Sequence, residues 1–331
     1  MTTGARRSLA ATAALMAATL LCPPSRADYK FYDVDYTGST NTTINGISNS
    51  GQLVGFSMDA AGAVTNFTDA FTITNGALTN HFTTVPLVGT APMANGLNTV
   101  GQVVGTDGTN AITFFNNVQT DLPPASPGTT MSEVAFGISD KGSIVGQYVD
   151  SVSGNTPGFY YANGKFTLLN PVANATVTNA QGVNNANQVI GFYSTDGVHQ
   201  HGFFYDATAG SFTLLADPNV ANLVLTQFLG LNDHGTAVGY YQTTDGSQHG
   251  FLYDLATHTY TFLDDPNAVT GGGVSITQIT GISNAGTITG FYIDPNGNQH
   301  GFVGIKAVPE PASLALLGLG AVVVLRRRKK C

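Results

Sequence analysis

Cysteine is scarce and tryptophan is absent in this 331-residue chain. Its two cysteines are Cys22 and Cys331. Cys22 lies within a segment that we expect to be removed, so the mature body would contain no disulfide and would be held together by its core alone. The nucleophile elbow of hydrolases, the phosphate-binding loop and the dinucleotide-binding fingerprint are also missing. These absences argue against the corresponding enzyme classes, and we expect no cofactor.

Basic residues are equally scarce in the central part of the chain. Residues 28–307 carry four lysines and no arginine against eighteen aspartates and Glu133, which gives a formal charge of −15. Such a surface repels nucleic-acid phosphates and anionic lipids. We therefore expect no nucleic-acid partner. A solvated acidic surface and a surface that collects divalent cations or neutral and basic sugars both stay open as interpretations.

Both ends of the chain are basic and apolar instead. The first 27 residues place Arg6 and Arg7 before an apolar stretch over 9–21, and they end in Ser-Arg-Ala at Ala27. This order is typical of a secretory signal peptide that is cleaved after Ala27. Residues 308–331 hold a Pro-Glu-Pro, an apolar run over 312–325 and a basic cluster, in which the marked residues are Pro309, Glu310, Pro311, Arg326, Arg327 and Arg328. The run is short for a transmembrane segment, since a spanning helix needs about 20 residues.

This tail closely resembles the PEP-CTERM sorting signal of Gram-negative bacteria. The resemblance rests on the Pro-Glu-Pro, the Leu/Gly/Ala/Val run and the basic stop, and it covers residues 308–330. It implies recognition by a membrane-embedded exosortase and delivery to the cell surface or the exopolysaccharide matrix. We accordingly expect an exported protein that is transiently anchored in the inner membrane, through this tail alone. The resemblance concerns location and says little about activity.

Between these ends, one ten-residue pattern occurs six times. Its copies begin 41 to 51 residues apart, at Gly46, Gly96, Gly137, Gly182, Gly230 and Gly281. Each copy belongs to a repeat that reads as four short strands, with β-branched and aromatic residues in the strands and Gly, Asn, Asp and Pro between them. Four strands in about 47 residues are typical of a β-propeller blade. We therefore predict an all-β repeat domain over residues 28–307.

The two ends of the repeat array predict how it closes. The sixth repeat stops after its third strand, at 300–303, and residues 29–35 form an orphan strand with no repeat before it. Joining them gives a six-bladed β-propeller of four-stranded repeats that is closed by the N-terminal strand. An ordinary edge strand at the N-terminus is the alternative. Closure would remove the exposed sheet edges of an open array.

A tight turn follows the first strand of every repeat. Its last residue is glycine in five repeats and asparagine in the other: Gly51, Gly101, Gly142, Gly235, Gly286 and Asn187. A type I turn followed by one left-handed residue has this signature, so all six residues should have positive φ. The second strand carries consecutive apolar residues, which predicts burial on both faces. We expect the strands that carry such residues, as at 189–190 and 288–289, to be the inner strands that line the central channel of the propeller.

Histidine recurs at the start of the third strand, as His201, His249 and His300, each followed by Gly-Phe. Earlier repeats place 157–159 and 69–71 at this position. Together with the glycine pattern upstream, these segments resemble the HAF extracellular repeat over about residues 42–305. The resemblance implies export and repetition, and it supplies no catalytic residues. The histidines are interpreted as partners in hydrogen bonds within their blades, with metal ligation as the alternative.

Aspartate-rich loops around the third and fourth strands allow two interpretations. Asp and Asn stabilise turns through their own backbone, and their oxygens also bind calcium. Aromatic pairs after the second strand, at 192–193 and 240–241, would stack on sugar rings if they were exposed. We expect a noncatalytic exported surface or biofilm-matrix protein that binds or scaffolds extracellular polysaccharide or protein partners. An exported glycan-acting enzyme with its site in the propeller channel is the alternative.

Overall fold

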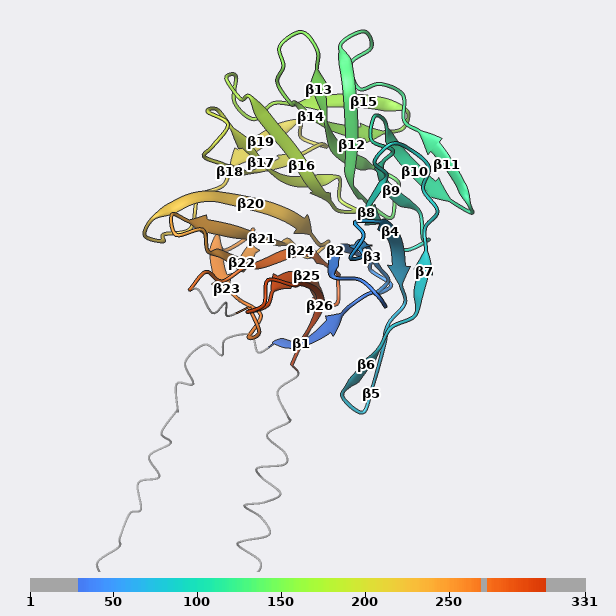
Figure 1. The fold of residues 1–331 in the computed structure, drawn as a ribbon. Coiled ribbons are helices and arrows are strands. Elements are labelled where there is room, and N and C mark those ends of the chain that lie inside the picture. The colour runs from blue at the N-terminus through green and yellow to red at the C-terminus, as the bar shows by residue number, and fades with distance from the viewer. Residues whose placement is uncertain (1–28, 269–272, 308–331) are drawn as a thin grey trace, which may run out of the picture.

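The computed structural model describes residues 29–268 and 273–307, and this part of the chain is all-β. Its sheets are arranged around a central channel in a propeller-like architecture (Figure 1). Within the described ranges, no helix has the length and apolarity needed to cross a membrane. The predicted signal cleavage site at Ala27 and the predicted sorting tail, with its Pro-Glu-Pro and basic cluster, lie outside the described residues.

The strands fall into six antiparallel units, each of which starts with the strand that carries the first glycine of one repeat. Units 6 and 1 belong to one sheet through a single parallel pair, Asn41 opposite Gln299. Unit 1 contains β2 (Asn41–Ile47), β3 (Leu53–Met58), β4 (Val64–Asp69) and β7 (Phe82–Thr84). Unit 2 contains β8 (Met93–Leu97), β9 (Val103–Thr106), β10 (Ala111–Phe115) and β11 (Val118–Asp121). Unit 3 contains β12 (Thr130–Ile138), β13 (Ile144–Asp150), β14 (Gly158–Ala162) and β15 (Lys165–Leu169).

The second half of the chain repeats this order. Unit 4 contains β16 (Val177–Val183), β17 (Gln188–Ser194), β18 (His201–Asp206) and β19 (Ser211–Leu214). Unit 5 contains β20 (Leu223–Leu231), β21 (Thr236–Thr243), β22 (Gln248–Asp254) and β23 (Thr259–Phe262). Unit 6 contains β24 (Thr277–Ile282), β25 (Ile288–Ile293) and β26 (Gln299–Lys306). A separate hairpin of β5 (Thr72–Thr74) and β6 (Ala77–Thr79) is inserted in unit 1 and extends away from the rest of the molecule (Figure 1).

The N-terminal strand β1 (Tyr29–Val34) pairs antiparallel with β26, from Tyr29 opposite Lys306 to Val34 opposite Gly301. Val34 is fully buried. The Tyr29 hydroxyl donates to the Gly286 carbonyl oxygen at 3.0 Å, which ties β1 to a turn of unit 6. In unit 6, β1 therefore holds the position on the third strand that β19 and β23 hold in units 4 and 5.

The last glycine of the repeated pattern lies opposite a β-bulge in the neighbouring strand. In every unit the ladder between the first two strands shifts register by one residue beside the pattern's first glycine. In unit 5, Gly239 lies opposite Phe228, and a Cβ on Gly239 would overlap the backbone oxygen of Gln227. The bulge thus admits only glycine there, which explains why this residue returns in all six repeats.

The six turn residues have the predicted backbone conformation. Their φ values are 87° at Gly51, 83° at Gly101, 82° at Gly142, 59° at Asn187, 77° at Gly235 and 78° at Gly286. Each turn also carries a backbone hydrogen bond across it, such as Gly142 N to Ser139 O at 2.9 Å. The left-handed conformation inferred from the turn pattern is therefore confirmed. The one residue of the six that is not glycine is Asn187, and asparagine adopts this conformation more readily than most other residues with a side chain.

The second strand of each unit is buried between its neighbours. Val189 and Ile190 are both fully buried, and they belong to two different core clusters. A similar cluster joins Val303 and Val34 of unit 6 to Ile44 of unit 1. Apolar residues on both faces of this strand therefore fill the junctions between units, and each junction buries aromatic and aliphatic side chains that no single unit could cover.

One alignment made from the sequence is wrong. Residues 69–71 were expected at the third-strand position of unit 1. Instead Phe67 lies opposite Gly55, as Phe203 lies opposite Gly191 in unit 4. Phe71 is only partly buried and packs beside the core cluster of Phe67. Phenylalanine occurs at both 67 and 71, and only Phe67 lies on β4; Phe71 follows β4 and precedes the inserted hairpin.

Candidate functional site

The channel is lined by the first strand of each unit. It encloses about 340 Å³, and its walls come from β2, β8, β12, β16, β20 and β24, with Phe291 of β25 in addition. Residues 189–190 and 288–289 were predicted to line it, and this prediction is wrong. Their side chains are buried in the junctions between units, because the second strand is flanked by other strands and by two neighbouring units.

Glycines allow the first strands to approach one another closely around the channel. A Cβ on Gly230 would lie 3.1 Å from the Cα of Gly281, and a Cβ on Gly281 would lie 3.1 Å from the Cα of Gly46. At Gly96 and Gly137 a Cβ would lie 2.5 and 2.4 Å from a backbone oxygen of the next unit, so contact between units favours glycine at these positions. The contact of Gly281 with Gly46 brings β24, the first strand of unit 6, against β2, the first strand of unit 1.

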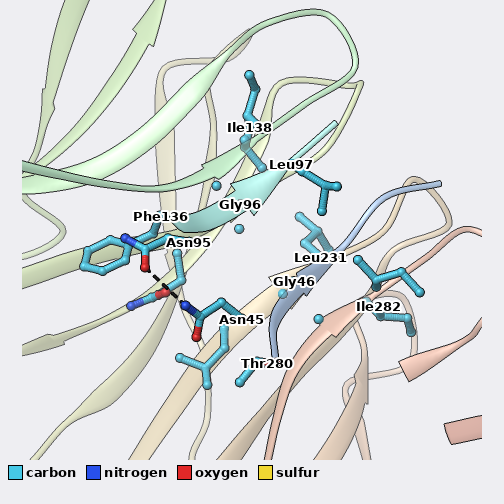
Figure 2. Close-up of a pocket in the computed structure, with 18 of the residues that line it drawn as sticks. Asn45, Gly46, Asn95, Gly96, Leu97, Phe136, Ile138, Leu231, Thr280 and Ile282 are labelled. Carbon is cyan, nitrogen blue, oxygen red and sulfur yellow. Dashed lines mark hydrogen bonds between the residues drawn. The ribbon is translucent and has the colours of Figure 1, made fainter. Parts of the chain in front are cut away.

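Amide side chains lie on the wall beside these glycines (Figure 2). Asn45 Nδ2 donates to the Ala94 carbonyl oxygen at 2.9 Å and to Asn95 Oδ1 at 3.3 Å. Asn95 Nδ2 in turn donates to the Ala135 carbonyl oxygen at 3.0 Å. Thr280 Oγ1 donates to the Ile44 carbonyl oxygen at 2.6 Å. These side chains bond the backbone of the next unit, so they fasten one first strand to another.

Past the glycines, an apolar ring lines both the channel and the smaller cavity beside it. It is formed by the next residue of each repeat: Ile47, Leu97, Ile138, Val183, Leu231 and Ile282. A smaller cavity of about 50 Å³ follows at the turns, and its walls include Asn49, Asp140, Asn185 and Asp233. At this end of the channel, which we call the polar mouth, the apolar ring is followed two residues later in the chain by polar side chains, as Ile47 is followed by Asn49.

Hydrogen bonds run in one direction around this polar mouth. The backbone N–H of one turn donates to the side-chain oxygen of the next: Asp140 N to Asn185 Oδ1 at 2.9 Å, Asn185 N to Asp233 Oδ1 at 2.8 Å, Asp233 N to Asn284 Oδ1 at 2.9 Å and Asn284 N to Asn49 Oδ1 at 2.9 Å. The last of these bonds joins unit 6 to unit 1. We call these turn residues the polar ring.

The two carboxylates of the polar ring are occupied by amide donors. Asp140 Oδ2 accepts from Asn49 and Asn185 at 3.0 and 3.1 Å. Asp233 Oδ2 accepts from Asn185 and Asn284 at 2.9 and 2.6 Å. Partial burial raises the pKa of Asp140, but hydrogen bonds from Thr99, Asn49 and Asn185 outweigh it and lower this pKa to about 2. Both groups therefore act as fixed acceptors that join units, and neither can donate a proton near neutral pH.

The three predicted histidines lie at equivalent places in units 4, 5 and 6. Each Nδ1 lies at hydrogen-bond distance from an aspartate Oδ2: His201 from Asp217 at 2.6 Å, His249 from Asp264 at 2.7 Å and His300 from Asp35 at 2.8 Å. A carboxylate only accepts, so each Nδ1 donates. Nε2 is then an acceptor wherever the ring is neutral, whereas the Nε2 of His300 faces a second carboxylate, with Asp294 Oδ2 at 3.6 Å. Asp217 and Asp264 follow the fourth strands of their own units, and Asp35 follows β1.

Each histidine ring also contacts a tyrosine from the second strand. The ring centroids are 5.7 Å apart for Tyr193 and His201, 5.1 Å for Tyr241 and His249, and 5.1 Å for Tyr292 and His300. The histidine side chains are 42%, 26% and 25% exposed in that order, so they are reachable from solvent. We call the three Tyr–His–Asp arrangements the histidine array.

The glutamine before each histidine of the array forms a hydrogen bond to the next unit, which the sequence motif alone did not predict. Gln227 Nε2 donates to Gln200 Oε1, Gln278 Nε2 donates to Gln248 Oε1, and Gln299 Nε2 donates to Thr43 Oγ1. Each pair joins the start of a third strand to the first strand of the next unit. The signal was present in the sequence, since Gln-His-Gly-Phe occurs three times, at 200–203, 248–251 and 299–302.

Two further expectations about ligand contacts can be assessed. The aromatic pairs at 192–193 and 240–241 are between 5% and 9% exposed, so they pack inside the units and cannot stack on a sugar. Within residues 29–268 and 273–307, no group of three or more His, Cys, Asp or Glu side chains is placed to hold a metal ion. Asp196 and Asp294 accept from backbone N–H groups of their own loops at 2.8 to 2.9 Å, as turn-stabilising aspartates do.

Comparison with protein families locates one known motif. Residues 307–329 match the PEP-CTERM protein-sorting motif. This motif marks an exported protein that an exosortase recognises and that is anchored in the membrane transiently before cleavage. The resemblance to the HAF repeat is not supported by a family match. No curated protein sequence matches the chain.

Solved structures with similar folds include proteins of different kinds. TolB from Acinetobacter baumannii is 12% identical with a TM-score of 0.48, and the match covers 77% of this chain and 64% of that one. The β-propeller domain of the Trilobed protease from Pyrococcus furiosus is 9% identical with a TM-score of 0.40, covering 80% and 95%. Trypanosoma rangeli sialidase is 11% identical with a TM-score of 0.49, covering 90% and 58%. These likenesses do not bear on the activity of this chain.

Proposed function

We propose that the six units are the blades of a closed six-bladed β-propeller, with β1 as the fourth strand of the last blade. Three contacts between chain ends support this closure. β1 pairs with β26, Gly281 meets Gly46 across the channel wall, and Asn284 of the polar ring bonds Asn49. The pairing of Asp35 with His300 adds a fourth argument, because Asp264 pairs with His249 in the same way one unit earlier.

We further propose that this exported propeller is a noncatalytic binding protein of the cell surface or its matrix, and that it binds extracellular polysaccharide. The histidine array carries this proposal. The same half-exposed arrangement occurs at the same end of three consecutive blades, and equivalent sites in a row suit a partner that itself repeats. A polymer that engages several weak sites gains affinity without any single strong contact.

The rest of the molecule is consistent with binding rather than turnover. The carboxylates at the polar mouth of the channel are held by amides from adjacent blades, so they join blades together. Changes there would remove bonds between blades, whereas each histidine of the array bonds an aspartate that belongs to the same proposed blade. This separation lets the array be tested by mutation.

A glycan array probed with the purified exported protein tests the proposal. The variant H201A/H249A/H300A should lose binding to the glycan that the wild type retains. The matched control is H81A/H199A/H234A, in which three histidines that are exposed and outside the array are changed, and it should bind as the wild type does. Equal binding by both variants would remove the array from the binding surface. Saturable hydrolysis of a bound glycan would instead favour the alternative, a glycan-acting enzyme.

A further inference from the structure

The wall of the channel is bonded from unit to unit in one half only. In units 6, 1 and 2 the side chain before the first glycine donates to a carbonyl oxygen of the next unit: Thr280 to Ile44, Asn45 to Ala94 and Asn95 to Ala135 (Figure 2). The equivalent residues of units 3, 4 and 5 are Phe136, Gln181 and Leu229. Phenylalanine and leucine cannot donate a side-chain hydrogen bond. Gln181 Nε2 donates instead to Asn179 Oδ1 of its own strand, at 2.9 Å. We call the wall from unit 3 to unit 6 the open half of the channel.

Three backbone carbonyl groups face this open half without a side-chain donor. Ala94 shows their direction, because its N–H donates to Asn66 Oδ1 of unit 1 at 2.8 Å and its carbonyl oxygen accepts from Asn45. Both groups therefore point away from the partner strand β9 and toward the preceding unit. The residues at the same place beside the bulge in units 4, 5 and 6 are Ala180, Phe228 and Ile279. Within the described ranges, their carbonyl oxygens accept no hydrogen bond from a side chain.

Amide oxygens on the same half of the channel also lack donors. Gln181, Gln227 and Gln278 line the channel in units 4, 5 and 6. Each uses its Nε2 as a donor, and the acceptors are Asn179, Gln200 and Gln248 in that order. Their Oε1 atoms accept no hydrogen bond within the described part of the chain, and these atoms are not enclosed by protein. The open half therefore presents carbonyl and amide oxygens together.

The chemistry of the channel suits a neutral molecule with hydroxyl groups. Among the described residues that line it, none carries a charge, so an ionic ligand would find no counter-charge there. A hydroxyl group donates to a carbonyl oxygen and also accepts from an amide. Phe136 and Leu229 add apolar surface on which the C–H face of a sugar ring can pack. The volume of about 340 Å³ lies near the lower end of the range for small-molecule sites, which is about 300–1,000 Å³, and thus suits one or two sugar rings.

We propose that the channel binds a neutral sugar of one or two rings. Its hydroxyl groups donate to the carbonyl oxygens of Ala180, Phe228 and Ile279, and its ring lies against Phe136. The site is separate from the histidine array, and the inference does not rest on the polysaccharide-binding function. The cavity of about 50 Å³ at the polar mouth is too small for a sugar ring, so the sugar enters from the opposite end. A chain cannot pass through, and the ligand is a free sugar or the end of a glycan.

Saturation-transfer NMR of the purified exported protein tests this site with D-glucose, D-galactose, D-mannose, cellobiose and maltose. At least one of these neutral sugars should bind saturably. The uronic acid and the amino sugar related to it should bind roughly tenfold more weakly, because the channel has no counter-charge for them. A hexamer of the bound sugar that displaces it identifies a chain end as the ligand, and a hexamer that does not displace it identifies the free sugar. Binding of none of the five neutral sugars would overturn the proposal.

Mutation then places the site in the channel. F136N removes the apolar surface and introduces the residue that units 1 and 2 carry, so its amide should bond the Ala180 carbonyl as Asn45 bonds that of Ala94. Sugar affinity should fall by roughly tenfold or more, while the melting temperature stays at or above that of the wild type. L229N makes the same change between units 5 and 6, and it serves if F136N does not fold. The control F115N changes an exposed phenylalanine outside the channel and should bind as the wild type does.

The same variants separate this site from the proposed function. H201A/H249A/H300A should keep the affinity for the small sugar, since the array lies outside the channel lining. Loss of polysaccharide binding by this variant with the small sugar still bound would support two distinct sites. Unchanged sugar affinity in a folded F136N or L229N, or loss of the small sugar in H201A/H249A/H300A, would refute the channel site and leave the polysaccharide-binding function standing.

Discussion

The clearest prediction concerns Glu133, which is the only glutamate in the folded body. It is 4% exposed on β12; its Oε1 accepts from Ala125 N at 3.1 Å, and its Oε2 has no hydrogen-bond partner. Burial raises the pKa of Glu133 from 4.5 to about 7, although the bond from Ala125 lowers it in part. Ionised Glu133 is therefore a buried charge without a counter-charge, and its ionisation should destabilise the fold.

The size of the effect follows from the shift. The folded state binds this proton more tightly than the unfolded state does, so its contribution is full below pH 4.5 and is lost as the pH rises through about 7. At about 1.4 kcal/mol for each pKa unit, the wild type loses roughly 3 kcal/mol by pH 8. E133Q cannot ionise. Its stability relative to the wild type should therefore rise by about 3 kcal/mol between pH 4 and pH 8.

Urea unfolding followed by far-ultraviolet circular dichroism at several pH values measures this difference. A constant offset between the two proteins is expected, because the glutamine amide replaces one oxygen by a donor, but only the pH-dependent part tests the reasoning. D121N, at an exposed carboxylate, is the control: it keeps Glu133, so its stability should follow that of the wild type at every pH. If E133Q and wild type keep the same difference from pH 4 to pH 8, Glu133 does not hold a proton in the folded state.

Two further predictions concern the architecture. G239A should destabilise by several kcal/mol, since its Cβ would overlap the Gln227 backbone, whereas G246A at an open turn should cost only about 1 kcal/mol for its left-handed conformation; similar melting temperatures for the two would refute the bulge argument. Deletion of residues 29–35 should cost at least ~3 kcal/mol through the lost ladder and the burial of Val34. Replacement of hairpin residues 72–79 by a short linker should cost less, because most of them are exposed; the opposite order would argue against closure by β1.

The turns could be predicted from the sequence because their requirements are local. A left-handed residue after a type I turn accepts glycine or asparagine, and this preference is legible in any single repeat. Asn187 and the five glycines therefore appear where expected. The pairing of residues 29–34 with the last repeat could also be predicted, since that repeat stops after its third strand and residues 29–35 have no repeat before them.

The lining of the channel could not be predicted in the same way. Apolar runs such as Val189-Ile190 indicate burial, but burial between units and burial toward a channel give the same pattern. Only packing distinguishes them, and it places the small and amide-bearing first strand inside, as with Asn45 and Gly46. Partners across the chain were equally invisible. His300 bonds Asp35, which lies at the other end of the sequence and belongs to no repeat motif.

The pairing of β1 with β26 also determines when the fold can be completed during export. A chain that is exported from its N-terminus delivers β1 first and β26 last, so β1 stays without its ladder partner while every other strand arrives. Contacts between distant parts of a chain form slowly, and strands with unpaired edges are prone to association with other chains. The interval before β26 arrives is therefore the period of greatest risk for the protein, and the final strand determines when that period ends.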